Sequence, residues 1–233
     1  MKLLLTSNGL SNKSIAVAFV KLVGKPAKDI KVAFIPTASM PEPDSKNWLI
    51  DDLYRIKNLG CDVDIVDLAN LTKKEWQERV KPCDVIFVGG GSTFYLSYWM
   101  QKSGLFEALP KLLETKVYAG ISAGSIIMGR TMRVTSEALE GIGILTDDEY
   151  EELGPPGRSS SKTLHFVDFN LRPHLNSKQS RRVRSEQFIA KIAPSMDGPL
   201  YAFDDASAIQ VVDGKVEPIS EGKWLLFNTE SNT

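Results

Sequence analysis

The sequence predicts an α/β protein in which a mostly parallel sheet is covered by helices on both faces. Two observations carry this prediction: short runs rich in valine and isoleucine alternate with longer amphipathic segments, and glycine or proline ends several of these segments. A third is the Asp213-Gly214 pair between two alternating segments, which predicts a C-terminal β-hairpin. No linker or internal repeat interrupts the 233 residues, so one domain spanning 1–233 is expected.

The predicted strands and helices alternate through the first half of the chain. Strands are expected at 2–7, 31–38, 61–68, 84–91 and 116–121. Helices are expected at 13–24, 47–60 and 73–81, and one or two more between 92 and 115. A loop follows at 147–162, then a strand-like run at 163–171, a helix-like run at 177–192 and a strand-rich tail.

The composition excludes several classes of protein. Hydrophobic residues make up 42% of the chain, enough to build a core without a metal or a disulfide staple. The formal net charge of -1 gives no reason to expect nucleic acid or an anionic membrane as a partner. Cys61 and Cys83 lack metal-ligand spacing, and no stretch could span a bilayer, so a cytoplasmic protein without metal or cofactor is expected.

The segment Gly120-Ile121-Ser122-Ala123-Gly124 joins a predicted strand to a predicted helix. In a Gly-x-Ser-x-Gly turn the small residues allow a tight bend, and the serine oxygen projects above the sheet beside a helix N-terminus. Backbone N–H groups there stabilise a tetrahedral oxyanion, and that of Ala123 is the natural first donor. The pattern predicts that Ser122 is a nucleophile, although a plain tight turn would also use small residues.

A serine nucleophile needs a base, and the chain offers only His165 and His174. His165 lies within a strand-like run, whereas His174 follows Pro173 on a predicted loop, which favours His174. Carboxylates that could orient the base lie between Ser122 and His174, and spacing does not choose among them. They are Glu137, Glu140, Asp147, Asp148 and Asp168.

A second glycine cluster, "VGGGSTF" at 88–94, follows a predicted buried strand. It matches neither the P-loop nor the dinucleotide-binding fingerprint, so phosphate binding is not favoured. Its N–H groups could supply a second oxyanion donor, or the glycines could simply permit a close backbone approach.

These segments together resemble the peptidase E family of serine peptidases, the aspartyl dipeptidases, whose relatives include cyanophycinase. The matching segments are "LLLTSNG", "FIPTAS", "VGGGSTF", "GISAGS" and "VDFNLRPHLNS", in this order along most of the chain. The resemblance implies a fold like that of the class I glutamine amidotransferase domain, with serine where those enzymes have cysteine.

The resemblance also implies roles for individual residues and a substrate. Carried over by position, Ser122 is the nucleophile, His174 the base and Glu137 the third member of the triad. The implied oxyanion donors are the N–H groups of Ala123 and of Gly91 or its neighbour Gly90. Family members of the dipeptidase type cleave after an N-terminal aspartate through an acyl-enzyme. The candidates for binding that aspartate side chain are Arg172, Arg181 and Arg184.

The sequence therefore favours a serine peptidase of small peptides, acting as a monomer or a homodimer. An α/β-hydrolase esterase is an alternative, because it shares the Gly-x-Ser-x-Gly turn and the order of serine, acid and histidine. A non-catalytic amidotransferase-like domain that binds a small molecule or a protein is a third interpretation.

Overall fold

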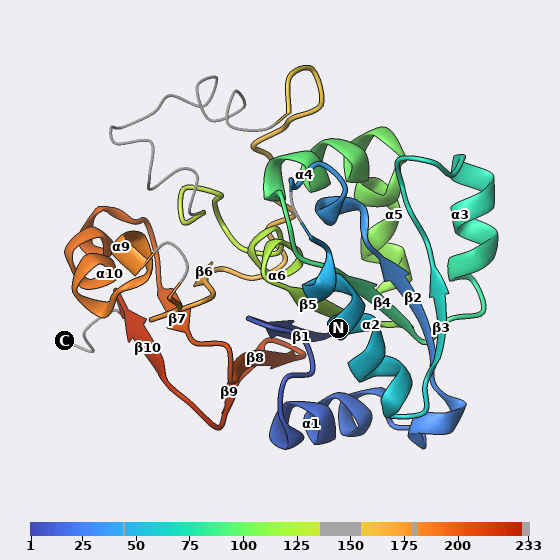
Figure 1. The fold of residues 1–233 in the computed structure, drawn as a ribbon, viewed down its shortest axis with the longest axis horizontal. Helices are drawn as coiled ribbons and strands as arrows, with labels where there is room; N and C mark the ends of the chain where they lie inside the picture. The colour runs from blue at the N-terminus through green and yellow to red at the C-terminus, as the bar shows by residue number, and fades with distance from the viewer. Residues whose placement is uncertain (44, 136–154, 179–180, 230–233) are drawn as a thin grey trace.

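The computed structural model describes residues 1–233 apart from 44, 136–154, 179–180 and 230–233. Its main sheet has seven strands in the order β3-β2-β4-β5-β1-β8-β9 (Figure 1). Five of them run parallel: β1 (Lys2–Thr6), β2 (Lys31–Ile35), β3 (Asp62–Ile65), β4 (Val85–Val88) and β5 (Val117–Ile121). The predicted α/β class is confirmed.

The C-terminal hairpin joins this sheet in the antiparallel direction. Strand β8 (Ser207–Val212) pairs with β1, and β9 (Lys215–Ser220) pairs with β8. Asp213 and Gly214 form the predicted turn, with φ of 48° and 85°, the left-handed values that a two-residue type I′ turn requires.

Helices cover both faces because successive strand residues point to opposite sides. On one face, Leu4 and Phe34 of the sheet pack in one cluster with residues of α1 (Lys13–Val23) and α2 (Asn47–Asn58). On the other face, Leu3 and Ile35 share a cluster with three more helices. These are α3 (Lys73–Val80), α4 (Thr93–Lys102) and α5 (Leu105–Leu112).

A smaller sheet of three strands lies beside the main one, in the order β10-β7-β6 (Figure 1). Its strands are β6 (Asn170–Arg172), β7 (Leu200–Phe203) and β10 (Trp224–Phe227). Two short helices, α9 (Arg181–Arg184) and α10 (Glu186–Ile192), lie next to it, and its core includes Leu200 and Ile189.

Two sequence predictions in this region were wrong in extent. The strand-like run at 163–171 is a strand only from Asn170, and His165 within it has a φ of 49° and an exposed side chain. The helix expected at 177–192 is interrupted at Ser185, whose extended backbone and side chain cap α10 by accepting a hydrogen bond from the Phe188 N–H. Serine favours such caps over helix interiors because its hydroxyl competes for backbone hydrogen bonds.

Within the described ranges, no helix combines the length and the apolar character needed to cross a bilayer.

Candidate active site

Ser122 lies at the junction of β5 with the short helix α6 (Ala123–Ile126), at the carboxyl edge of the parallel strands. Its backbone has φ 48° and ψ -104°, a conformation that residues other than glycine rarely adopt. The Ser122 N–H donates to the Thr6 carbonyl at 3.0 Å, and the Ser125 hydroxyl donates to the same oxygen at 2.8 Å. The strained turn is thus held by the end of the neighbouring strand β1.

The two glycines of this turn are required by close backbone approaches. A Cβ at Gly120 would lie 2.5 Å from the Gly124 carbonyl oxygen, and a Cβ at Gly124 would lie 2.3 Å from the Val88 carbonyl oxygen. The Tyr118 hydroxyl donates to the Gly124 carbonyl at 2.6 Å from within the core. The small residues therefore let the helix start directly against β4 and β5.

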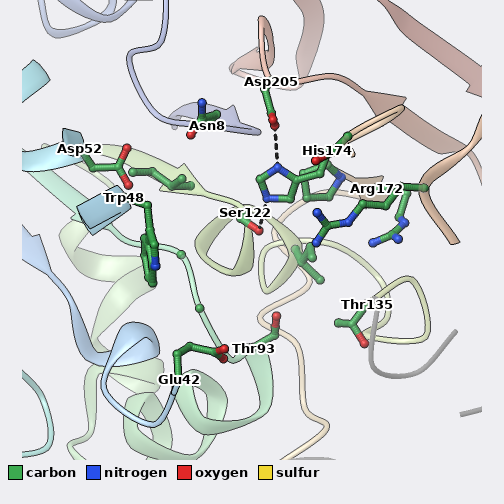
Figure 2. Close-up of a pocket in the computed structure, with 17 residues that line it drawn as sticks. Asn8, Glu42, Trp48, Asp52, Thr93, Ser122, Thr135, Arg172, His174 and Asp205 are labelled. Carbon is green, nitrogen blue, oxygen red and sulfur yellow. Dashed lines mark hydrogen bonds and ion pairs between the residues drawn. The ribbon is translucent and has the colours of Figure 1, made fainter. Parts of the chain in front are cut away.

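His174 lies two residues beyond β6, and its ring faces Ser122 (Figure 2). Its Nε2 is 2.9 Å from the Ser122 Oγ, and its Nδ1 is 2.6 Å from Asp205 Oδ1. Asp205 lies in the loop between β7 and β8. Serine, histidine and carboxylate thus form one continuous hydrogen-bonded chain.

Ser7, the residue after β1, ties the histidine and the carboxylate together. Its buried hydroxyl donates to Asp205 Oδ1 at 2.8 Å and accepts from the backbone N–H of His174 at 2.8 Å. His174 has a φ of 63°, a left-handed conformation that needs such support from its surroundings. Sequence reasoning missed this serine, although it sits in the segment "LLLTSNG".

The environment of Asp205 keeps its carboxyl group ionised. Burial alone would raise its pKa, but the hydrogen bond and charge of His174 lower it, with further contributions from the Ser7 hydroxyl and the charge of Arg184. The net effect is a pKa below the ordinary value. A carboxylate at this position favours the tautomer with the proton on Nδ1, which leaves Nε2 free to accept from Ser122.

The predicted acid, Glu137, lies outside the described residues, as do Glu140, Asp147 and Asp148. Asp168 is exposed and interacts with Arg130 and His165. Asp205 was not among the candidates because only carboxylates between the serine and the histidine were considered. The signal available was the pair "DD" directly after the strand-like "LYAF", since strand ends carry functional groups in this kind of sheet.

The predicted oxyanion donors lie around Ser122. A Cβ at Gly90 would be 3.4 Å from the Ser122 Cβ, and one at Gly91 would be 2.1 Å from the Ala38 carbonyl oxygen, so Gly91 (φ 127°) must be glycine. The N–H groups of Gly90, Gly91 and Ala123 donate to no other described residue. They are available to an oxygen bound beside Ser122.

A cavity of about 440 Å³ opens over Ser122, within the size range of small-molecule sites (Figure 2). Its lining carries both basic and acidic side chains. Arg172 lies on the His174 side of Ser122, whereas Asp52 and Trp48 of α2 lie on the other side.

The three arginines predicted to bind substrate lie in different places in the structure. Arg172 lines the cavity and is 2% exposed, and its Nη2 donates to the Val183 carbonyl at 2.8 Å. Arg184 also lines the cavity. Arg181 begins α9, but its side chain lies outside the described part of the structure, and Arg182 is exposed.

Asp52 is a buried carboxyl group that sequence reasoning did not single out. It is 3% exposed, and its Oδ1 accepts from Arg55 Nη1 at 3.1 Å. Burial, reinforced by the charge of Asp51, raises its pKa to about 7 in spite of Arg55. In the part of the chain that the structure describes, no three histidine, cysteine, aspartate or glutamate side chains gather as a metal site.

Comparison with known proteins identifies a family of peptidases. The sequence pattern of Peptidase family S51 matches residues 3–219. "Uncharacterized peptidase YgaJ" of Bacillus subtilis is 28% identical over 80% of this chain and 71% of its own length. "Peptidase E" of Shewanella baltica is 26% identical over 71% of this chain and 61% of its own length.

A solved structure shares the fold. It is described as a putative peptidase E protein from Listeria monocytogenes, and it superposes with a TM-score of 0.74 at 22% identity. The match covers 95% of this chain and 98% of that one. The expected resemblance to the peptidase E family is confirmed.

The raised pKa of Asp52 predicts a pH dependence of stability. The folded state holds the Asp52 proton up to about pH 7, whereas the unfolded chain releases it near pH 4. The protonated group therefore makes its full contribution to the free energy of unfolding below about pH 4. This contribution, up to about 4 kcal/mol, is lost as the pH rises through 7. When the pH is raised from 4.5 to 8, thermal unfolding should show a larger loss of stability for the wild type than for Asp52→Asn.

Asp29→Asn is the matched control, because Asp29 is exposed and is not among the charges that shift the pKa of Asp52. This variant should follow the wild type across the pH range. Equal pH dependence in the wild type and in Asp52→Asn would contradict the assignment.

Proposed function

Since this chain belongs to peptidase family S51 and is a peptidase, we propose that it hydrolyses small peptides through an acyl-enzyme formed on Ser122. In this proposal His174 is the general base and Asp205 is the acid that orients it. The observation that carries the proposal is the continuous contact from Ser122 Oγ to His174 Nε2 at 2.9 Å and from Nδ1 to Asp205 at 2.6 Å.

The geometry supports a mechanism in two stages. As Ser122 Oγ attacks the peptide carbonyl carbon, its proton passes to His174 Nε2, and the N–H groups of Ala123 and of Gly90 or Gly91 stabilise the oxyanion. The C–N bond then breaks, and His174 returns the proton to the leaving amine. In the second stage His174 takes a proton from water, the hydroxide attacks the ester, and Ser122 recovers its proton as the acid product leaves.

We propose Asp205 in place of Glu137 as the triad acid. Asp205 contacts Nδ1 directly, and its lowered pKa keeps it charged at neutral pH, so it can stabilise the imidazolium that forms in each stage. The family match also favours a peptidase over the esterase and over the non-catalytic binding domain that the sequence left open.

The proposed substrate is a dipeptide with an N-terminal aspartate. Arg172 and Arg184 line the cavity on the histidine side, and guanidinium groups bind carboxylates through paired hydrogen bonds. Together they would hold the aspartate side chain while its carbonyl carbon lies against Ser122.

Ser122→Ala should lower kcat for Asp-X dipeptides by on the order of a millionfold, because no other group can take the acyl chain. His174→Ala should be similarly damaging, and the double variant should be little worse than either single one. His165→Ala is the matched histidine control and should retain activity, because His165 is exposed and its Nε2 faces Asp168 rather than Ser122. A Ser122→Ala enzyme with a tenth of the parent's kcat would exclude this nucleophile.

Asp205→Asn should lower kcat about ten-thousandfold, because asparagine favours the wrong tautomer of His174. Asp168→Asn, the exposed control, should leave kcat nearly unchanged. Glu137→Gln decides between the two assignments. A severe loss in Glu137→Gln with a silent Asp205→Asn would return the acid to Glu137.

Arg184→Met should raise KM for Asp-X by about ten- to thirtyfold, since a charge pair partly open to solvent is lost. Ala-X, which lacks the carboxylate, should be hydrolysed with an unchanged KM. Arg182→Met is the matched control on the exposed side of the same helix. If both Arg184→Met and Arg172→Met keep the preference for Asp-X, the acid pocket lies elsewhere.

A further inference from the structure

The cavity carries an acidic wall opposite the arginines. Asp52 and Trp48 lie on one side of Ser122 in Figure 2, and Arg172 and His174 lie on the other. Glu42 lines the same cavity. A substrate whose scissile carbonyl sits at Ser122 would therefore place one part toward the arginines and the other toward the carboxyl groups of Asp52 and Glu42.

The Asp52 carboxylate is held close to the nucleophile's strand. A Cβ added to Gly9 would lie 2.9 Å from Asp52 Oδ1 and 3.2 Å from Ile121 Cδ1, so both side chains pack around this glycine. Ile121 directly precedes Ser122. Glycine at position 9, with a φ of 64°, leaves room for this carboxylate. The absence of a side chain at Gly9 thus allows Asp52 to lie at the cavity wall.

The hydrogen-bonding capacity of Asp52 is only partly used. Among the described residues, Arg55 alone lies within hydrogen-bond distance of the carboxylate, and it contacts Oδ1. Because burial raises the pKa of Asp52 to about 7, the group is only partly ionised at neutral pH, and a cationic partner would favour its carboxylate form. Asp52 lines the cavity, and none of the described residues donates a hydrogen bond to its Oδ2, so the carboxylate can accept a further partner from a bound ligand.

Trp48 adds an aromatic surface next to this carboxylate. It lies four residues before Asp52 in α2, a spacing that brings two side chains onto one helix face. An indole ring packs well against the aliphatic stem of lysine or arginine and attracts the cationic end. The pair therefore matches a long side chain that is apolar along its length and positive at its tip.

We propose that the Asp52 side of the cavity is the leaving-group subsite and selects peptides whose second residue has a basic side chain. The proposal rests on the proposed function: when the N-terminal aspartate lies at the arginines, the residue beyond the scissile bond lies on the opposite side of Ser122. The favoured substrate class is an acidic residue followed by lysine or arginine.

Three dipeptides with the same first residue test this directly: Asp-Lys, Asp-norleucine and Asp-Glu. Norleucine matches the lysine stem without its charge. The wild type should show kcat/KM for Asp-Lys at least about tenfold above Asp-norleucine, and Asp-Glu should be poorest. In Asp52→Asn the ratio of Asp-Lys to Asp-norleucine should fall close to 1, whereas Asp29→Asn, at an exposed carboxylate that does not shift the pKa of Asp52, should keep the wild-type ratio.

An unchanged ratio in Asp52→Asn would overturn the proposal, and so would a wild-type ratio near 1. If the ratio is near 1 but N-acetylation of Asp-norleucine weakens binding only when Asp52 is present, Asp52 binds the substrate's α-ammonium group and the leaving-group assignment is wrong.

Binding to the inactive Ser122→Ala variant separates this proposal from the proposed function. Calorimetry should give tighter binding of Asp-Lys than of Asp-norleucine by about tenfold, and Asp52→Asn in the same background should remove the difference. If the wild type hydrolyses no dipeptide, the proposed function fails, and the binding difference still decides on Asp52. Equal binding of the two peptides would reject the subsite. Thermal unfolding of each variant at the assay pH verifies that it is folded.

Discussion

The backbone junction between β5 and α6 is the constraint on which the site depends. The helix can begin directly against the sheet only because Gly120 and Gly124 present no side chain to the neighbouring carbonyls. Thr6 at the end of β1 then holds both the Ser122 N–H and the Ser125 hydroxyl. This arrangement aims the Ser122 oxygen at the ring of His174 and leaves the first N–H of the helix available beside it.

The basic and the acidic side chains of the cavity come from different secondary-structure elements. Arg172 of β6 and Arg184 of α9 form the basic wall, whereas Asp52 belongs to α2, which packs on the main sheet. Ser122 lies between them, so under the proposed function the same contacts would orient a dipolar peptide and align its carbonyl. Electrostatic complementarity of this kind discriminates between substrates more than it raises affinity for all of them.

The main sheet was predictable because alternation and buried runs report directly on strands, and the glycine turn reported on Ser122. The region after residue 160 was less predictable. Strand-like residues at 163–169 form no strand, and Ser185 caps a second helix, α10. Asp205 could not be found from spacing, since it reaches His174 only when β7 and β8 bring their connecting loop back across the sheet. Such contacts depend on topology rather than on local pattern.

The position of β1 between β5 and β8 has a consequence for the order in which the protein can mature. This strand is flanked by β5 and β8, so its second partner (Ser207–Val212) follows it by about two hundred residues. Asp205 lies just before that partner, and Ser7 just after β1. A chain still emerging from the ribosome therefore holds Ser122 and His174 without the strand and carboxylate that align them. Under the proposed role of Asp205, hydrolytic competence arises late in synthesis, when both halves of the site exist.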